Sequence, residues 1–164
     1  MSADMIVNMA KGAWEVIKDG KPSTEITGST ANAVPQVDDW TSLESARGPL
    51  NATMGWTKWV GWPAPDHTYV YVDFKILLKW TYGATYKGGG LFIPNVWIEV
   101  PECYAGWSWD VNISLTTRNP ENFGTKAAPI ARLPVTIRGS VSTYEQSHNV
   151  DWGVVVYGNG RADT

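Results

Sequence analysis

The amino-acid sequence predicts an all-β fold, a single-domain antiparallel β-sandwich with at most one or two short helices. Ten Trp and seven Tyr occur with sixteen Gly and ten Pro in 164 residues, a composition typical of short strands and tight turns. Several stretches alternate apolar and polar residues, which is the period of a half-buried strand. The length suits one domain with a full core, and no internal repeat is evident. We therefore expect one β-sandwich domain over residues 1–164.

The N-terminal part combines short strand candidates with a long segment of weak pattern. Alternating apolar residues indicate strands between residues 5 and 18, and Asp19-Gly20 is a turn signal. From about residue 21 to 67, Gly, Ser, Thr, Asn and Pro dominate, and this range is predicted to be a long irregular segment. Inside it, the run from Asp38 to Gly48 fits a two-turn helix with an acidic start and a glycine stop.

The strongest strand signal lies at residues 68–80. One face of this run carries only large apolar residues, namely Val70, Val72, Phe74, Ile76, Leu78 and Trp80. The run is long for a single strand, so a bend or a change of sheet midway is expected.

Residues 91–115 are predicted to form two strands joined by a corner at 101–106. The first strand has apolar residues on one face and Trp97 with Glu99 on the other, and the second alternates up to Leu115. Pro101 and Gly106 direct the backbone at the corner. Further strands are expected at 130–142, where Pro134 favours an edge or a bulge, and at 150–156.

Charge and residue content argue against several function classes. The net charge is −3, the pI is about 5.3, and the Lys and Arg residues form no run, so no nucleic-acid partner is expected. His67, His148 and Cys103 have no short ligand spacing, so neither a metal nor another cofactor is expected. No nucleophile motif or phosphate loop is evident, and we predict a protein that is not an enzyme. A paired-carboxylate glycosidase stays open as an alternative, with Asp73, Glu99, Glu102 and Asp110 as candidates.

The sequence also bears on the compartment. The single Cys103 rules out an intrachain disulfide, and the first residues lack a basic region followed by an apolar run. We expect synthesis in the cytoplasm without a visible signal peptide. An extracellular site of action would then require a removed signal or unconventional export.

Aromatic residues are the main candidates for recognition. Trp56, Trp59 and Trp62 recur at intervals of three among Gly and Pro, which favours a loop over a helix. Trp and Tyr stack on sugar rings and sit at membrane interfaces, because one end is apolar and the other forms hydrogen bonds. The Trp cluster would either form such a patch or close one end of the sandwich.

The stretch NVWIEVPECYAGWSWDVNI resembles the central region of the actinoporin-like fold, which actinoporins and fungal fruit-body lectins share. In that fold a strand ends in Val-Pro, an aromatic corner follows, and the next strand opens with Trp-Asp-Val or a close variant. Pro101, Tyr104 and Trp107 match this pattern. The resemblance covers residues 68–157, of which about 20 match closely. It implies a β-sandwich that binds a lipid headgroup or a sugar.

Departures from the family alter the expected ligand. Glu99 stands where the family's headgroup site has a hydroxyl residue, and its charge would repel a phosphate. The segment after the Trp strand contains Phe123 and no Tyr, and a strand candidate at Met5 leaves little room for an N-terminal pore-forming helix. A sugar is therefore favoured over phosphocholine, with Glu99, Asp110 and Asn112 accepting hydroxyl hydrogen bonds.

These observations predict a non-enzymatic recognition protein, lectin-like or toxin-like. It would bind a carbohydrate or membrane-surface ligand at one end of the sandwich, and a homo-oligomer is expected. A structural subunit of a viral or phage particle or another assembly, and a pore-forming cytolysin, are the alternatives. The candidate ligand-binding residues are Trp56, Trp59, Trp62, Tyr69, Tyr71, Trp97, Glu99, Pro101, Tyr104 and Trp107.

Overall fold

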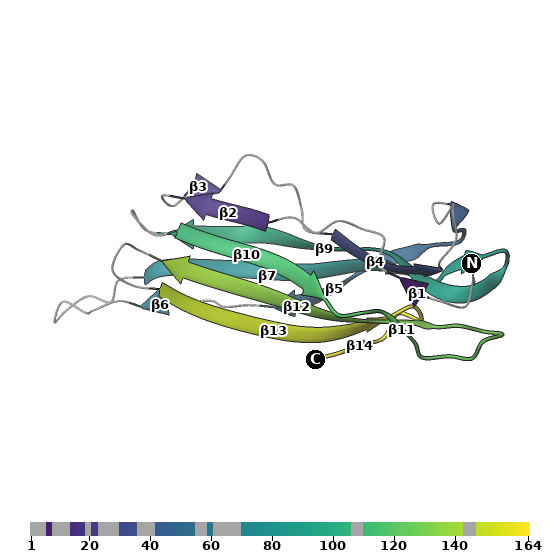
Figure 1. The fold of residues 1–164 in the computed structure, drawn as a ribbon. Helices are drawn as coiled ribbons and strands as arrows, with labels where there is room; N and C mark the ends of the chain where they lie inside the picture. The colour runs from purple at the N-terminus through teal and green to yellow at the C-terminus, as the bar shows by residue number, and fades with distance from the viewer. Residues whose placement is uncertain are drawn as a thin grey trace.

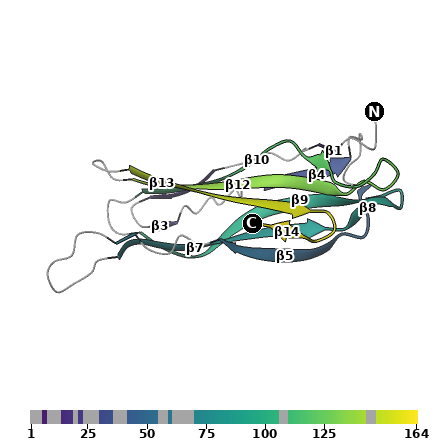
Figure 2. The same ribbon diagram turned by 90° about the horizontal axis from the view of Figure 1, so that it is seen from below.

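Two antiparallel β-sheets stacked face to face make up the molecule, so the predicted all-β sandwich is confirmed (Figures 1 and 2). The structure is a computed structural model, and it describes residues 6–7, 14–18, 21–22, 30–35, 42–54, 59–60, 70–105, 110–142 and 147–164. Within these ranges no α-helix occurs. The strands are long, and the sandwich is elongated along them (Figure 1).

Each sheet consists of seven strands. Two short strands of the first sheet and one of the second lie outside the linear strand order and each pair with a strand within it. The order in the first sheet is β1 (Ile6–Val7), β4 (Thr30–Pro35), β9 (Gly89–Ala105), β7 (Val70–Tyr82) and β5 (Arg47–Met54), with β6 (Trp59–Val60) beside β7 and β8 (Ala84–Tyr86) beside β9. The order in the second sheet is β14 (Ala162–Asp163), β13 (Ser147–Tyr157), β12 (Ala131–Ser142), β10 (Asp110–Thr117), β2 (Trp14–Lys18) and β3 (Lys21–Pro22), with β11 (Glu121–Asn122) beside β12.

The core lies between the sheets and follows the alternation of the strands. Ile76, Leu78 and Trp80 on β7 are buried, whereas Leu77 and Lys79 between them are half-buried and lie on the outer face. The predicted inner face of β7 is thus confirmed where its side chains are described. The opposite wall of the core comes from Ile113, Leu115, Leu133, Val135, Ile137, Val154 and Val156.

Residues 91–115 cross from one sheet to the other. β9 pairs with β4, β7 and β8, whereas β10 pairs with β2 and β12. The predicted corner at Pro101 is wrong, because β9 continues to Ala105. The register pairs Lys75 with Glu102 and Leu77 with Glu99, so Val100 and Pro101 together face one residue of β7. Pro101 therefore lies at a β-bulge, where a missing N–H is tolerated.

Pro94, the other proline of β9, also lies where the strand register shifts. Ala33 pairs with Ile93 and Ala31 with Val96, so Pro94 lies at another register shift, against β4. The change of sheet expected within residues 68–80 is wrong, because β7 stays in one sheet from Val70 to Tyr82. The bulge between β7 and β9 has its extra residue on β9.

The prediction of an irregular segment over residues 21–67 is wrong for β4 and β5. In β4 the core positions include Ala31 and Ala33, whose small side chains give a weak hydrophobic pattern although both are fully buried. β5 begins with Arg47, Gly48 and Pro49, which resemble turn residues. The predicted helix is wrong at its described end, because Arg47 and Gly48 belong to β5.

Pro134 lies inside β12, between two neighbouring strands, and not at a sheet edge. Its carbonyl accepts the N–H of Arg118 at 3.1 Å, just after β10 ends at Thr117 and before β11 begins. The nitrogen of Pro134 therefore faces a gap in the ladder, where no N–H is needed.

The predicted final strand is confirmed as β13, and Gly158, Asn159 and Gly160 form the turn into β14.

Candidate functional site

Of the ten residues predicted to bind a ligand, three have described side chains. Trp97 is half-buried, and Glu99 and Pro101 are exposed. For three more only the backbone is described, namely Trp59 on β6, Tyr71 on β7 and Tyr104 on β9. The remaining four, Trp56, Trp62, Tyr69 and Trp107, lie outside the described residues.

Trp97 and Glu99 contact each other on the outer face of the first sheet, together with a lysine from β7. The indole Nε1–H of Trp97 donates a hydrogen bond to Glu99 Oε1 at 3.3 Å. Lys79 Nζ lies 2.8 Å from Glu99 Oε2. We call these three residues the Trp97 cluster. One carboxylate oxygen accepts from the indole and the other pairs with the ammonium group, which favours this orientation of the ring.

Strand register explains why these residues meet. Lys79 pairs with Trp97, and Leu77 pairs with Glu99, so Lys79 and Glu99 are diagonal neighbours on adjacent strands. On the next strand, Asn51 of β5 pairs with Lys79 and is exposed. An amide, an ammonium group and an indole thus lie in one row across β5, β7 and β9. This row combines hydrogen-bond donors and acceptors with an aromatic ring.

The electrostatics of the cluster keep Glu99 ionised. The hydrogen bond from Lys79, and after it the one from Trp97, lower the pKa of the Glu99 carboxyl below its usual value, and the small effect of burial opposes them. A general acid of a glycosidase needs a raised pKa. Glu99 is therefore better suited to accept hydrogen bonds than to donate a proton.

The cluster lies on the face of the sheet and not at an end of the sandwich. Position 97 is near the middle of β9, which runs from Gly89 to Ala105. The prediction of a site at one end is therefore wrong for Trp97 and Glu99. Lys79 and Asn51 were missed, because alternation predicts which face a residue occupies, whereas only the register between strands decides its partners.

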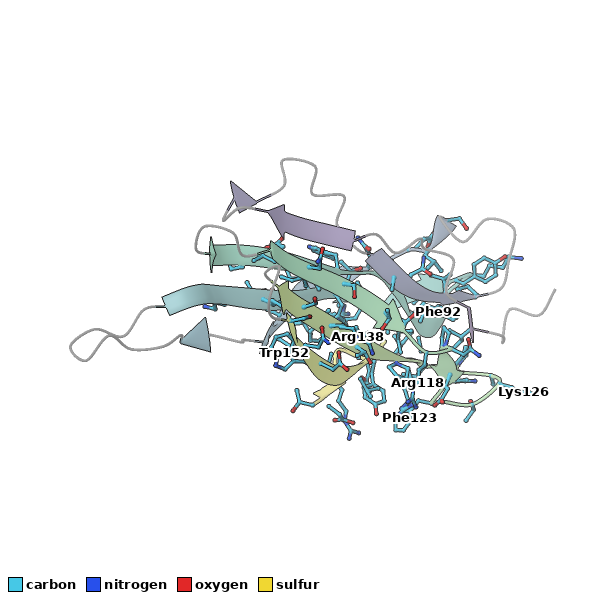
Figure 3. All side chains as sticks on the ribbon, turned by 60° about the vertical axis from the view of Figure 1, so that its left-hand side comes forward. Phe92, Arg118, Phe123, Lys126, Arg138 and Trp152 are labelled. Atoms are coloured by element: carbon cyan, nitrogen blue, oxygen red, sulfur yellow. The ribbon has the colours of Figure 1, made fainter. Side chains whose placement is uncertain are left out.

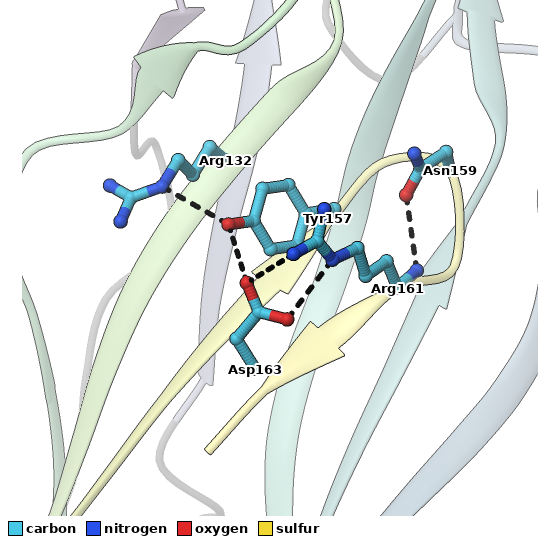
Figure 4. Close-up of polar contacts among 5 residues, drawn as sticks. All are labelled: Arg132, Tyr157, Asn159, Arg161 and Asp163. Carbon is cyan, nitrogen blue, oxygen red and sulfur yellow. Dashed lines mark hydrogen bonds and ion pairs between the residues drawn. The ribbon is translucent and has the colours of Figure 1, made fainter.

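A second polar cluster lies on the outer face of the second sheet (Figure 4). The Tyr157 hydroxyl donates to Asp163 at 2.9 Å and accepts from Arg132 at 3.4 Å. Arg161 forms an ion pair with Asp163, and Arg132 forms one with Glu121. Each charge has a partner of opposite sign, so this cluster is suited to fastening β11 and β14 to the sheet.

Metal-binding and membrane-spanning features are absent from the part of the chain that the structure describes. No three His, Cys, Asp or Glu side chains converge there as ligands would. None of its segments forms a helix with the length and apolar character needed to span a membrane.

Comparison with known proteins adds no relative. No protein-family model matches the sequence, and searches of the curated proteins and of the solved structures find no match. The resemblance to actinoporin-like proteins therefore stays a prediction.

Proposed function

We propose that the protein is a non-enzymatic recognition protein that binds carbohydrate through the Trp97 cluster and Asn51. The observation that supports this most is the half-exposed indole of Trp97, whose Nε1–H donates a hydrogen bond to the Glu99 carboxylate and thereby favours one orientation of the ring. An indole held in this way loses little conformational freedom when a ligand binds, which favours affinity.

The groups around the indole complement the hydroxyl groups of a sugar. The apolar ring faces of sugars pack on aromatic side chains, whose large flat surface is released from water. An ionised carboxylate has about four lone-pair positions, and Lys79 and Trp97 use two of them. The others are left to accept hydroxyl hydrogen bonds, while the amide of Asn51 both donates and accepts.

The proposal is tested by a glycan array followed by titration of the best ligand. Trp97→Ala should weaken binding at least about tenfold, because the stacking surface is lost. Trp97→Phe should bind with intermediate affinity, since it keeps a ring but loses the N–H that Glu99 holds. The control is Phe123→Ala, which removes an exposed aromatic ring just after β11 and should leave binding unchanged.

Two results would contradict the proposal. One is the absence of binding to any glycan on the array. The other is a ligand whose affinity Trp97→Ala leaves unaltered while circular dichroism shows that the variant is folded. A parallel test with zwitterionic and anionic vesicles would identify a membrane-surface ligand, which would replace the carbohydrate if only vesicles bind.

A further inference from the structure

A pocket of about 260 Å³ lies at the seam between the two sheets, and none of its lining residues belongs to the Trp97 cluster. Its walls come from the start of β5, the end of β7, β8, β9 and the turn between β13 and β14. The lining residues are Ser45, Arg47, Tyr82, Gly83, Thr85, Leu91, Gly158 and Asn159. We call it the Arg47 pocket.

The lining is rich in hydrogen-bond donors and includes no acidic side chain. Arg47 is exposed, and among the described residues it has no ion pair. Asn159 Oδ1 accepts the N–H of Arg161 at 3.1 Å, which leaves its amide N–H groups free to donate. Together with the hydroxyls of Ser45 and Tyr82, these groups create a positive, donor-rich site.

Backbone contacts hold the pocket in shape. Gly83 N–H donates to Gly158 O at 2.8 Å and thereby ties the first sheet to the turn of the second. Glu44, next to Ser45, exchanges two backbone hydrogen bonds of 2.9 and 2.8 Å with Thr85, which ties the start of the β5 segment to β8. Ser45 has a φ of +62°, which is costly for a residue with a side chain and is typical of functional sites.

The position of Arg47 is also defined. It pairs with Tyr82 on the neighbouring strand. A methyl group built on Gly83 would lie 3.6 Å from Arg47 Cδ, so the aliphatic stem of the arginine runs along the glycine. Because the aliphatic stem packs along the glycine, the guanidinium group loses less conformational freedom when a ligand binds in the pocket.

We propose that the Arg47 pocket binds a small oxyanion, the carboxylate of a sugar acid or a phosphate monoester. Arg47 would form paired hydrogen bonds with two oxygens of the anion, which its planar guanidinium group suits. Ser45, Tyr82 and Asn159 would bind the remaining oxygens. The pocket is smaller than the about 300 to 1,000 Å³ of sites for drug-sized ligands, so it fits a single small group.

Calorimetric titration with inorganic phosphate, glucuronate and uncharged glucose tests this proposal. We expect saturable binding of phosphate or glucuronate with a Kd of about 1 mM or tighter, and none of glucose. Binding of phosphate alone would identify a phosphate ligand, and binding of glucuronate alone a carboxylate. Arg47→Gln should weaken anion binding at least about tenfold. Arg47→Lys should bind with intermediate affinity, because lysine keeps the positive charge but lacks the planar guanidinium group that forms paired hydrogen bonds.

Arg118→Gln is the matched control. Arg118 is an exposed arginine outside the pocket, on the segment after β10 (Figure 3), so its loss changes the net charge equally and should leave binding unchanged. The absence of saturable binding of both anions would overturn the proposal, as would equal affinities of Arg47→Gln and the unmodified protein. Trp97→Ala should leave anion binding intact, so failure here and failure of the proposed carbohydrate site are distinguishable.

Discussion

At the scale of single residues, protonation of Glu99 affects the hydrogen bond that orients the indole ring of Trp97. The folded-state pKa of Glu99 is lowered, so ionised Glu99 stabilises the fold above its unfolded pKa. That contribution is lost as the pH falls through the folded pKa. Protonation also removes the charge that Lys79 pairs with, and it weakens the acceptor for the Trp97 N–H.

The indole N–H resonance of Trp97 should therefore titrate with a midpoint below 4.5, the ordinary pKa of a glutamate. Lys79→Met should move this midpoint upward, because the larger cause of the lowered pKa is removed. NMR spectra recorded against pH measure both midpoints. Lys75→Met removes a charge from the same strand without contacting Glu99 and serves as the control; equal shifts in the two variants would contradict the assignment.

At the scale of elements, the seam between the sheets depends on a glycine. A side chain at Gly158 would collide with the backbone oxygen of Leu91, so the turn after β13 approaches β9 more closely than any other residue allows. Gly153, inside β13, has no atom within 4 Å of an added methyl group. Gly153 is therefore a matched control for Gly158, five residues away along the chain.

Gly158→Ala should lower the free energy of unfolding by about 1 to 3 kcal/mol, because the backbone must shift to admit the methyl group. Gly153→Ala should change it by less than about 0.5 kcal/mol. Urea denaturation of both variants gives these values. If Gly158→Ala is as stable as Gly153→Ala, the close contact between turn and sheet is not required.

At the scale of the whole molecule, both sheets share one core, and consecutive strands such as β3 and β4, or β9 and β10, belong to different sheets. Neither sheet can bury its inner face alone. Unfolding should therefore be a single transition in which both sheets are lost together.

Leu78→Ala in the first sheet and Leu133→Ala in the second should each lower the free energy of unfolding by about 2 to 5 kcal/mol, since both side chains are fully buried. Far-ultraviolet circular dichroism and Trp fluorescence should give coincident midpoints in both variants. Leu77→Ala, on the outer face beside Leu78, should have a much smaller effect. Separate transitions for the two probes would mean that the sheets unfold independently.

The sequence by itself determined the fold class, the inner face of β7 and the presence of Trp97 and Glu99 on one outer face. These features depend on alternation along a single strand, which local sequence records. It did not reveal β4 and β5, because small core residues and a Gly-Pro start give no period-2 pattern.

Only the tertiary structure decided how the strands combine. It places β9 and β10 in different sheets and shows a bulge at Pro101 where a corner was expected. It also brings Lys79 next to Glu99, and Arg47 and Asn159 into one pocket. Arg47 and Asn159 are more than a hundred residues apart in the chain. The physical reason is that pairing partners in a sheet come from remote segments, so register and stacking arise from the whole core and not from local pattern.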